Sequence, residues 1–288
     1  MSVSDGRVQT SHGTIAYSET SGQGLPLVLV HGNSADRRAF RLQLDSDIGS
    51  VHRLIAFDLP GHGDSDRASD PEATYSIKGY ANAVTEALSE MGVKHAAVYG
   101  WSLGGHIALE MVPAFPGLVG MMLTGTPPIP PVLEEAQAGF QPSPNLGILG
   151  KPDLTDEEIA ILAFATYGEL ADDAARETIR RTDGVARAMM FASLMAGGIS
   201  DERAIAETAP LPIAMVNGEA DPIVNLDYVS GLSYANLWED HHFILRGAAH
   251  APFLQVPEVF NPILGRFAGA MEKRASNAVV AGSAVSAA

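Results

Sequence analysis

The sequence predicts an α/β protein with a mostly parallel central sheet, helices on both faces, and a helical cap inserted between core strands. Three observations support this prediction. Short continuous apolar runs end at glycine, proline or polar turn residues, which is typical of strands buried on both faces of a parallel sheet. Amphipathic helical patterns alternate with these runs. One long stretch, in contrast, carries helical patterns and no convincing strand.

Eight segments are predicted to form strands. The first two flank Ser11-His12-Gly13, a turn sequence typical of a hairpin. The later segments are continuous apolar runs, each followed by a turn. The predicted strands are Arg7–Thr10, Thr14–Ser18, Leu27–Val30, Arg53–Phe57, Ala96–Tyr99, Val119–Leu123, Pro212–Val216 and Phe243–Leu245.

Helices are predicted between the strands, as parallel pairing requires. The clearest pattern is one apolar stripe between Ile77 and Met91, with residues three or four apart on the same face. A second helix is predicted directly after Ser102, and a last one over Gln255–Lys273.

The stretch without strands runs over residues 127–207 and is predicted to be a helical cap over the active site. A helix over Asp156–Thr166 has Thr155 as its N-cap, and Arg187–Met195 is apolar and rich in methionine. The core is then residues 1–126 and 208–274. The tail, residues 275–288, is rich in Ala, Ser, Val and Gly, and we predict that it is disordered.

The composition fits one large, well-buried domain and excludes several partners and sites. The chain has 288 residues, 46% hydrophobic, with a net charge of −16 and no cysteine. Disulfides, thiolate metal sites and cysteine nucleophiles are therefore excluded. An acidic surface repels phosphates and anionic lipids, so we expect neither nucleic acid nor a membrane as partner. The polar N-terminal residues and the lack of an apolar run of ~20 residues predict a cytoplasmic protein.

The first chemical motif is Gly100-Trp101-Ser102-Leu103-Gly104, which follows a predicted strand and precedes a predicted helix. A serine on such a turn has a strained backbone and needs small flanking residues. The helix N-terminus favours negative charge on the serine oxygen. We predict that Ser102 is a nucleophile of the α/β-hydrolase fold. The alternative is an ordinary serine in a glycine-rich turn.

A second motif, His31-Gly32-Asn33, directly follows an earlier buried strand. The α/β-hydrolase fold places an oxyanion donor at this point. We assign the backbone N–H groups of Asn33 and Leu103 as the two donors, with the Asn33 side chain as a further candidate for substrate contact. His31 is interpreted as structural.

The acid and the base are predicted from the last two strands. Glu219 and Asp221 both follow the strand after the cap; Asp221 is favoured because it directly precedes a proline, the usual position in this fold. His250 follows the last strand and is the predicted base, which gives the order Ser102…Asp221…His250.

The other histidines are given different interpretations. His241 and His242 precede the last strand, at the opposite end of the sheet, while His62 and His106 are interpreted as structural or solvated. A catalytic metal is the rival way to open an ester, but the chain has no H-E-x-x-H pattern. His241 and His242 cannot both face one ion from a strand. We expect no metal and no cofactor.

Beyond the fold, the chain resembles the metal-independent N-acyl-homoserine lactonases, quorum-quenching enzymes of the α/β-hydrolase fold. The more specific shared motifs are Gly125–Pro128, Arg181–Gly184 and Asn236–Glu239. The shared stretches are Ser11–Gly13, His31–Ser34, Asp58–Gly63, Tyr80–Ala81, Gly100–Ile107, Thr124–Pro128, Arg181–Gly184, Val216–Gly218, Asn236–Glu239 and His250–Phe253.

The resemblance implies a lactone substrate with an N-acyl chain, no metal, and a tunnel between core and cap. It places the nucleophile at Ser102, the base at His250, and the oxyanion donors at Asn33 and Leu103. The family's acid directly precedes a proline, which matches Asp221, although that acid can be Glu in the family. Departures are concentrated in the cap, where the acyl chain would lie.

The predicted partner is a small neutral ester or lactone with an apolar acyl chain. The predicted substrate-binding residues are Gly32, Asn33, Trp101, Phe140 and Phe164. The apolar cap side chains could instead simply pack against the core. Three functions stay open: an N-acyl-homoserine lactonase, a broader carboxylesterase or carbon–carbon bond hydrolase with the same triad, and a non-catalytic ligand-binding member of the fold. The sequence leaves the oligomeric state open.

Overall fold

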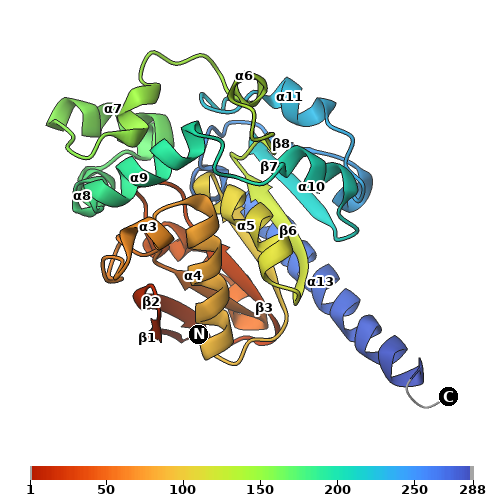
Figure 1. Cartoon of the computed structure of the whole chain (residues 1–288). Helices are drawn as coiled ribbons and strands as arrows, with labels where there is room; N and C mark the ends of the chain where they lie inside the picture. Colours follow the sequence, from red (N-terminus) through yellow and green to blue (C-terminus); the bar gives the residue numbers. More distant parts are fainter. Residues whose placement is uncertain (1, 286–288) are drawn as a thin grey trace.

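A computed structural model describes residues 2–285 and contains one eight-stranded sheet (Figure 1). The strand order is β1-β2-β4-β3-β5-β6-β7-β8. The β1–β2 and β2–β4 pairs are antiparallel, and all the other pairs are parallel. The strands are β1 Val3–Thr10, β2 Gly13–Thr20, β3 Gln23–Val30, β4 His52–Phe57, β5 Ala96–Trp101, β6 Leu118–Thr124, β7 Ile213–Gly218 and β8 Phe243–Leu245. The predicted fold class and all eight predicted strands are confirmed.

Alternation along the central strands divides the core into two layers. On β3, Val28 and Val30 pack on one face of the sheet with the helices α4 (Ile77–Glu90) and α5 (Leu103–Ala114). Leu27 and Leu29 pack on the other face with α13 (Pro257–Val285). Helices cover both faces of the sheet, so neither set of alternating side chains on a central strand faces water. This explains why the central strands are continuous apolar runs and do not alternate between apolar and polar residues.

The helices connect and cover these strands. The α-helices are α1 Arg41–Leu44, α2 Asp47–Val51, α3 Pro71–Thr74, α4 Ile77–Glu90, α5 Leu103–Ala114, α6 Leu133–Ala136, α7 Asp156–Tyr167, α8 Asp173–Arg181, α9 Gly184–Met195, α10 Glu202–Thr208, α11 Leu226–Gly231, α12 Pro252–Gln255 and α13 Pro257–Val285. None of those described has both the length and the hydropathy needed to cross a membrane.

The last predicted helix differs from the structure at both ends. The segment predicted as one helix over Gln255–Lys273 is divided between α12 and α13, because Pro257 is suited to the first turn of a helix and not to its interior. In the structure α13 continues over residues 275–285, the greater part of the predicted disordered tail (Figure 1). The disorder of the tail stays a prediction. Alanine recurs in this segment and favours a helix. Residues 286–288 lie outside the described residues.

The segment 127–207, called the cap below, supplies α6 to α10 between β6 and β7. Figure 1 shows α7, α8 and α9 gathered at one end of the sheet. Thr155 caps α7 as predicted: its hydroxyl accepts from the Glu158 N–H at 3.2 Å, and the Glu158 carboxylate accepts from the Thr155 N–H at 3.0 Å. The division of the chain into a core and a separate cap domain stays a prediction.

The turn after β4 contains a histidine that is buried in its neutral form. His62 is 2% exposed, and its Nδ1 donates to the Pro60 carbonyl at 3.1 Å. Its Nε2 has no hydrogen-bond partner among the described residues. Burial, together with the neighbouring His31, lowers the pKa of His62 from 6.5 to about 3. A proton added to this ring would therefore be a buried charge without a partner.

We predict that His62 makes folding stability depend on pH between 6.5 and 3. In that window the unfolded chain binds a proton at His62 and the folded protein does not, so stability falls as pH falls, by about 1.4 kcal/mol per pH unit. His62→Gln removes this contribution, and urea unfolding at several pH values should give a flatter profile. The exposed His95 provides the control, since His95→Gln should keep the wild-type slope. Equal slopes for wild type and His62→Gln would contradict the prediction.

Candidate active site

Ser102 lies on a tight turn between β5 and α5. Its backbone has a φ of 55°, in the left-handed region that is strained for a non-glycine residue. The Ser102 N–H donates to the Thr124 carbonyl, and the Thr126 hydroxyl donates to the Ser102 carbonyl, both at 2.8 Å. A Cβ on Gly104 would lie 2.0 Å from the Val30 carbonyl oxygen, so the turn can approach β3 only with glycine there. These contacts hold the strained serine in place.

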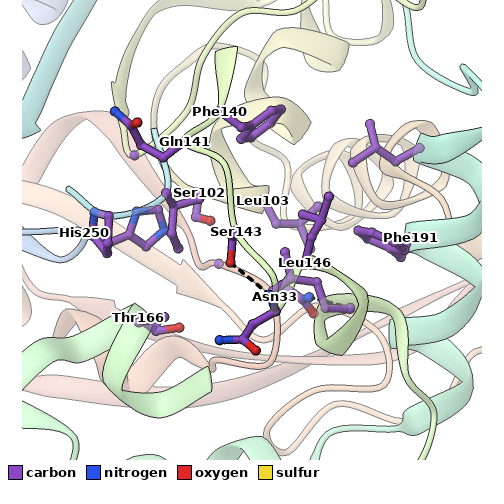
Figure 2. Close-up of a pocket in the computed structure, with 18 of the residues that line it drawn as sticks. Asn33, Ser102, Leu103, Phe140, Gln141, Ser143, Leu146, Thr166, Phe191 and His250 are labelled. Atoms are coloured by element: carbon purple, nitrogen blue, oxygen red, sulfur yellow. Dashed lines mark hydrogen bonds between the residues drawn. The ribbon is translucent and has the colours of Figure 1, made fainter. Parts of the chain in front are cut away.

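His250 and Asp221 form a buried pair beside this turn. The His250 Nδ1 lies 2.9 Å from one carboxylate oxygen of Asp221 and 3.1 Å from the other. The two residues are 1% and 7% exposed. Glu219, the alternative acid, is exposed. Figure 2 shows the His250 ring beside Ser102.

The Ser102 hydroxyl makes no hydrogen bond to any described residue. In free enzymes, a catalytic hydrogen bond of this kind is often long and tightens only when substrate is bound. The arrangement therefore leaves Ser102 adjacent to a histidine that a carboxylate already orients.

The charged form of Asp221 is favoured despite its burial. Burial alone would raise its pKa, but His250 and the backbone N–H groups of Ile223 and Val224 outweigh it, so the pKa of Asp221 lies below its usual value. The N–H groups donate to one carboxylate oxygen at 2.8 and 3.1 Å. An ionised Asp221 fixes the His250 tautomer with hydrogen on Nδ1 and leaves Nε2 free to accept a proton.

Two further residues determine where the His250 ring lies. The Trp101 indole N–H donates to the His250 carbonyl at 2.8 Å. A Cβ added to Gly125 would lie 2.7 Å from Cε1 of the His250 ring, and Gly125 has a φ of 63°. The ring is thus packed against a backbone position that only glycine can occupy without displacement.

The predicted oxyanion donors, Asn33 and Leu103, line the same cavity as Ser102. Leu103 is the first residue of α5, so its N–H has no acceptor within the helix. The Asn33 N–H likewise finds no acceptor in the part of the chain that the structure describes. The Asn33 side chain is not free: its Nδ2 donates to the Leu149 carbonyl of the cap at 3.1 Å.

A cavity of about 1380 Å³ opens above these groups, between the core and the cap (Figure 2). Its lining is mostly apolar, and its only Asp, Glu, Lys or Arg residues are Glu134 and Glu157, both exposed. Phe164 is 60% exposed. The predicted site residues that line the cavity are Gly32, Asn33, Trp101, Ser102, Leu103, Phe140, Phe164 and His250. Asp221 is not among the lining residues, since it lies behind His250.

Some residues of the site carry no strong sequence signal. Gly125 and Thr126 belong to the Gly125–Pro128 motif, but the motif did not reveal their contacts with His250 and Ser102. His106 also lines the cavity, where its Nδ1 lies 2.8 Å from the buried carboxylate of Glu202. Glu202 is 96 residues away in the sequence, so local pattern could not reveal this pair.

The remaining histidines lie elsewhere, as their sequence context suggested. His31 is fully buried and its Nε2 accepts from the Leu59 N–H at 3.0 Å, while His241 and His242 lie before β8 and do not line the cavity. Among residues 2–285 no three His, Asp or Glu side chains gather as a metal site would require. The prediction of metal-independent chemistry is left to experiment.

Comparison with known proteins relates this geometry to a family. The model of the alpha/beta hydrolase family matches residues 27–263. A mutant of the N-acyl homoserine lactonase AidH complexed with N-hexanoyl homoserine is 42% identical, covers 92% of this chain and 96% of its own, and superposes with a TM-score of 0.89. A second AidH structure, complexed with N-hexanoyl homoserine lactone, has a TM-score of 0.88 at the same identity and covers 97% of its own chain.

Curated relatives are more distant. An uncharacterised protein of Mycobacterium bovis is 31% identical over 40% of this chain, which spans only about a third (33%) of that relative's length. The pimeloyl-[acyl-carrier protein] methyl ester esterase of Yersinia pseudotuberculosis is 27% identical over 88% of this chain and 96% of its own.

The fold, the strained serine turn and these similarities agree. The chain belongs to the alpha/beta hydrolase family.

Proposed function

We propose that this protein opens the lactone ring of N-acyl-homoserine lactones, with Ser102 as nucleophile, His250 as base and Asp221 as the acid that orients it. The observation that carries the lactone is the 42% identity to AidH over 92% of the chain, together with the homoserine lactone bound in an AidH structure. The mostly apolar cavity beside Ser102 supports an N-acyl substrate, since an acyl chain gains free energy by leaving water. Quorum quenching is the corresponding biological role.

The chemistry would proceed through an acyl-enzyme. Ser102 Oγ attacks the lactone carbonyl carbon while His250 Nε2 takes its proton. The carbonyl oxygen becomes negative and accepts hydrogen bonds from the N–H groups of Asn33 and Leu103. The ring C–O bond then breaks, and the homoserine oxygen takes the proton from His250. Water, activated by the same histidine, releases N-acyl-homoserine and restores Ser102.

A broader carboxylesterase is the second candidate. The esterase of Yersinia pseudotuberculosis covers most of the chain, and the same triad would hydrolyse open-chain esters. Nothing about Ser102, Asp221 or His250 distinguishes a ring ester from an open one. The difference must lie in the cavity, where a lactone keeps its leaving group attached and an open ester does not.

The lactone proposal predicts a ring-opened product that contains one added water, formed from acyl-homoserine lactones of several chain lengths. Mass spectrometry checks the product, and an added chelator should leave the rate unchanged. Ser102→Ala should lower kcat by about 10⁴-fold or more, because the acyl-enzyme cannot form. Rapid turnover of simple aryl esters with intact lactones would instead identify a carboxylesterase.

For the acid, we expect Asp221→Asn to lower kcat by on the order of 10³–10⁴-fold, because the amide cannot stabilise the imidazolium or enforce the productive tautomer. Glu219→Gln is the matched control and should leave kcat within about twofold, since this side chain is exposed and surface changes are usually small. Steady-state kinetics on one substrate decides, and the reverse pattern would make Glu219 the acid.

A third prediction concerns the space around His250. Gly125→Ala places a methyl group 2.7 Å from the His250 ring and should lower kcat by about 100-fold, because a displaced base costs rate steeply. The control is Gly92→Ala. Gly92 has a similar φ of 71° but nothing within 4 Å of an added Cβ, so it tests backbone strain alone. Similar losses in the two variants would show that strain, and not the His250 contact, is responsible.

A further inference from the structure

Arg187 is a buried cation on the cap helix α9 that joins several segments. It is 2% exposed, and its guanidinium donates four hydrogen bonds. Three go to cap carbonyls: Ile179 at 2.9 Å, Lys151 at 3.1 Å and Pro152 at 3.3 Å. The fourth crosses to the core, from Nε to the Ser34 hydroxyl at 2.9 Å.

The partners of Arg187 are unusual for a buried cation. All four acceptors are neutral, and the carboxylates of Asp183 and Asp153, whose charges raise the pKa of Arg187, form no hydrogen bond with it. Neutral partners only partly replace the water that a charged group loses on burial, and burial accordingly lowers the pKa of Arg187. The planar guanidinium can, however, donate in several fixed directions at once, which a lysine ammonium cannot reproduce. The arrangement fits a role in fixing geometry.

The core contact of Arg187 leads directly to the proposed oxyanion donor. The Ser34 hydroxyl, which accepts from Arg187, donates to the Asn33 side-chain oxygen at 3.1 Å. The Asn33 side-chain nitrogen donates to the Leu149 carbonyl of the cap at 3.1 Å. Both ends of this side-chain amide are therefore held, one through Ser34 and Arg187 and the other by the cap itself.

We propose that Arg187 is a positioning residue that couples the position of the cap on the core to the orientation of the Asn33 N–H. The proposal rests on the function proposed above, because it needs Asn33 as an oxyanion donor. Ser34 has a φ of 59°, so the turn that carries Asn33 is in a strained conformation that its surroundings must hold. The hydrogen bonds from Arg187 through Ser34, and from Asn33 to Leu149, stabilise this turn. The Asn33 N–H is then oriented toward the substrate carbonyl beside Ser102.

The physical consequence is a loss of rate without a loss of binding. A donor aimed at the oxyanion acts mainly on the transition state, and complete removal of one donor costs about 10²–10³-fold in kcat. A donor that is only tilted should cost less, on the order of tenfold. The cavity that binds the acyl chain would be unchanged, so KM should stay within about twofold.

The test is a double-mutant cycle between Ser34 and Arg187, measured on the protein's own ester or lactone substrate. Ser34→Ala removes the link to Asn33 but keeps the three cap bonds of Arg187, and should lower kcat about tenfold with KM unchanged. Arg187→Lys should lower kcat at least as much, and the double variant should lose no more than Arg187→Lys alone. Independent, additive losses would overturn the coupling, as would an unchanged kcat in Ser34→Ala.

A matched control separates positioning from general loosening of the cap. At another point of the cap, the Ser200 hydroxyl donates to the buried Glu110 of α5 at 2.8 Å, far in sequence from Asn33. Ser200→Ala removes one cap–core hydrogen bond without touching the Asn33 turn. It should lower Tm while kcat stays at the wild-type value. A loss of kcat equal to that of Ser34→Ala would show that cap loosening alone explains the effect.

A readout that needs no turnover distinguishes this proposal from the proposed function. The backbone amide signal of Asn33, followed by ¹⁵N NMR, should shift in Ser34→Ala and in Arg187→Lys, and should stay in place in Ser200→Ala. If the wild type hydrolyses no lactone, the lactonase proposal fails, while the amide shifts still report whether Arg187 positions Asn33. An Asn33 signal that does not move in either variant overturns the positioning role.

Discussion

The close approach of the β5–α5 turn to β3 is the constraint on which the rest of the site depends. Gly104 can lie against the Val30 carbonyl only because it has no side chain, and this brings the N-terminus of α5 beside the end of β3. The turn that follows β3 carries Asn33, which lines the same cavity as Leu103. The proposed nucleophile Ser102, the neighbouring Leu103 and the distant Asn33 thus line one cavity because two backbones touch.

The sequence predicts those features of the fold and the site that depend on residues close together in the chain. Leu27–Val30 is continuous and apolar because α4, α5 and α13 cover both faces of β3. Ser102 is evident from its flanking glycines, and Asp221 from the proline that follows it. The strand order adds that His250 and Asp221 leave neighbouring strands, at the same edge of the sheet. The placement of these residues at one edge of the sheet could therefore be expected from the sequence.

What could not be predicted depends on contacts across the fold. Glu202 pairs with His106, and Arg187 reaches Ser34, over separations that no periodicity records. The extent of α13 differs from the sequence-based expectation for another reason. Alanine is common both in flexible tails and in helices, so composition alone does not distinguish the two over residues 275–285. The high helix propensity of alanine is consistent with the helix found there.

The charge of the cavity lining has a consequence for product release. Hydrolysis of any neutral ester or lactone at neutral pH leaves a carboxylate. The lining offers that anion no Lys or Arg, whereas Glu134 and Glu157 carry negative charge at exposed positions and the chain as a whole has a net charge of −16. The negative charge around the cavity therefore has little effect on a neutral substrate but repels a carboxylate product. The proposed reaction thus converts a neutral substrate into an anion that the charge around the cavity disfavours.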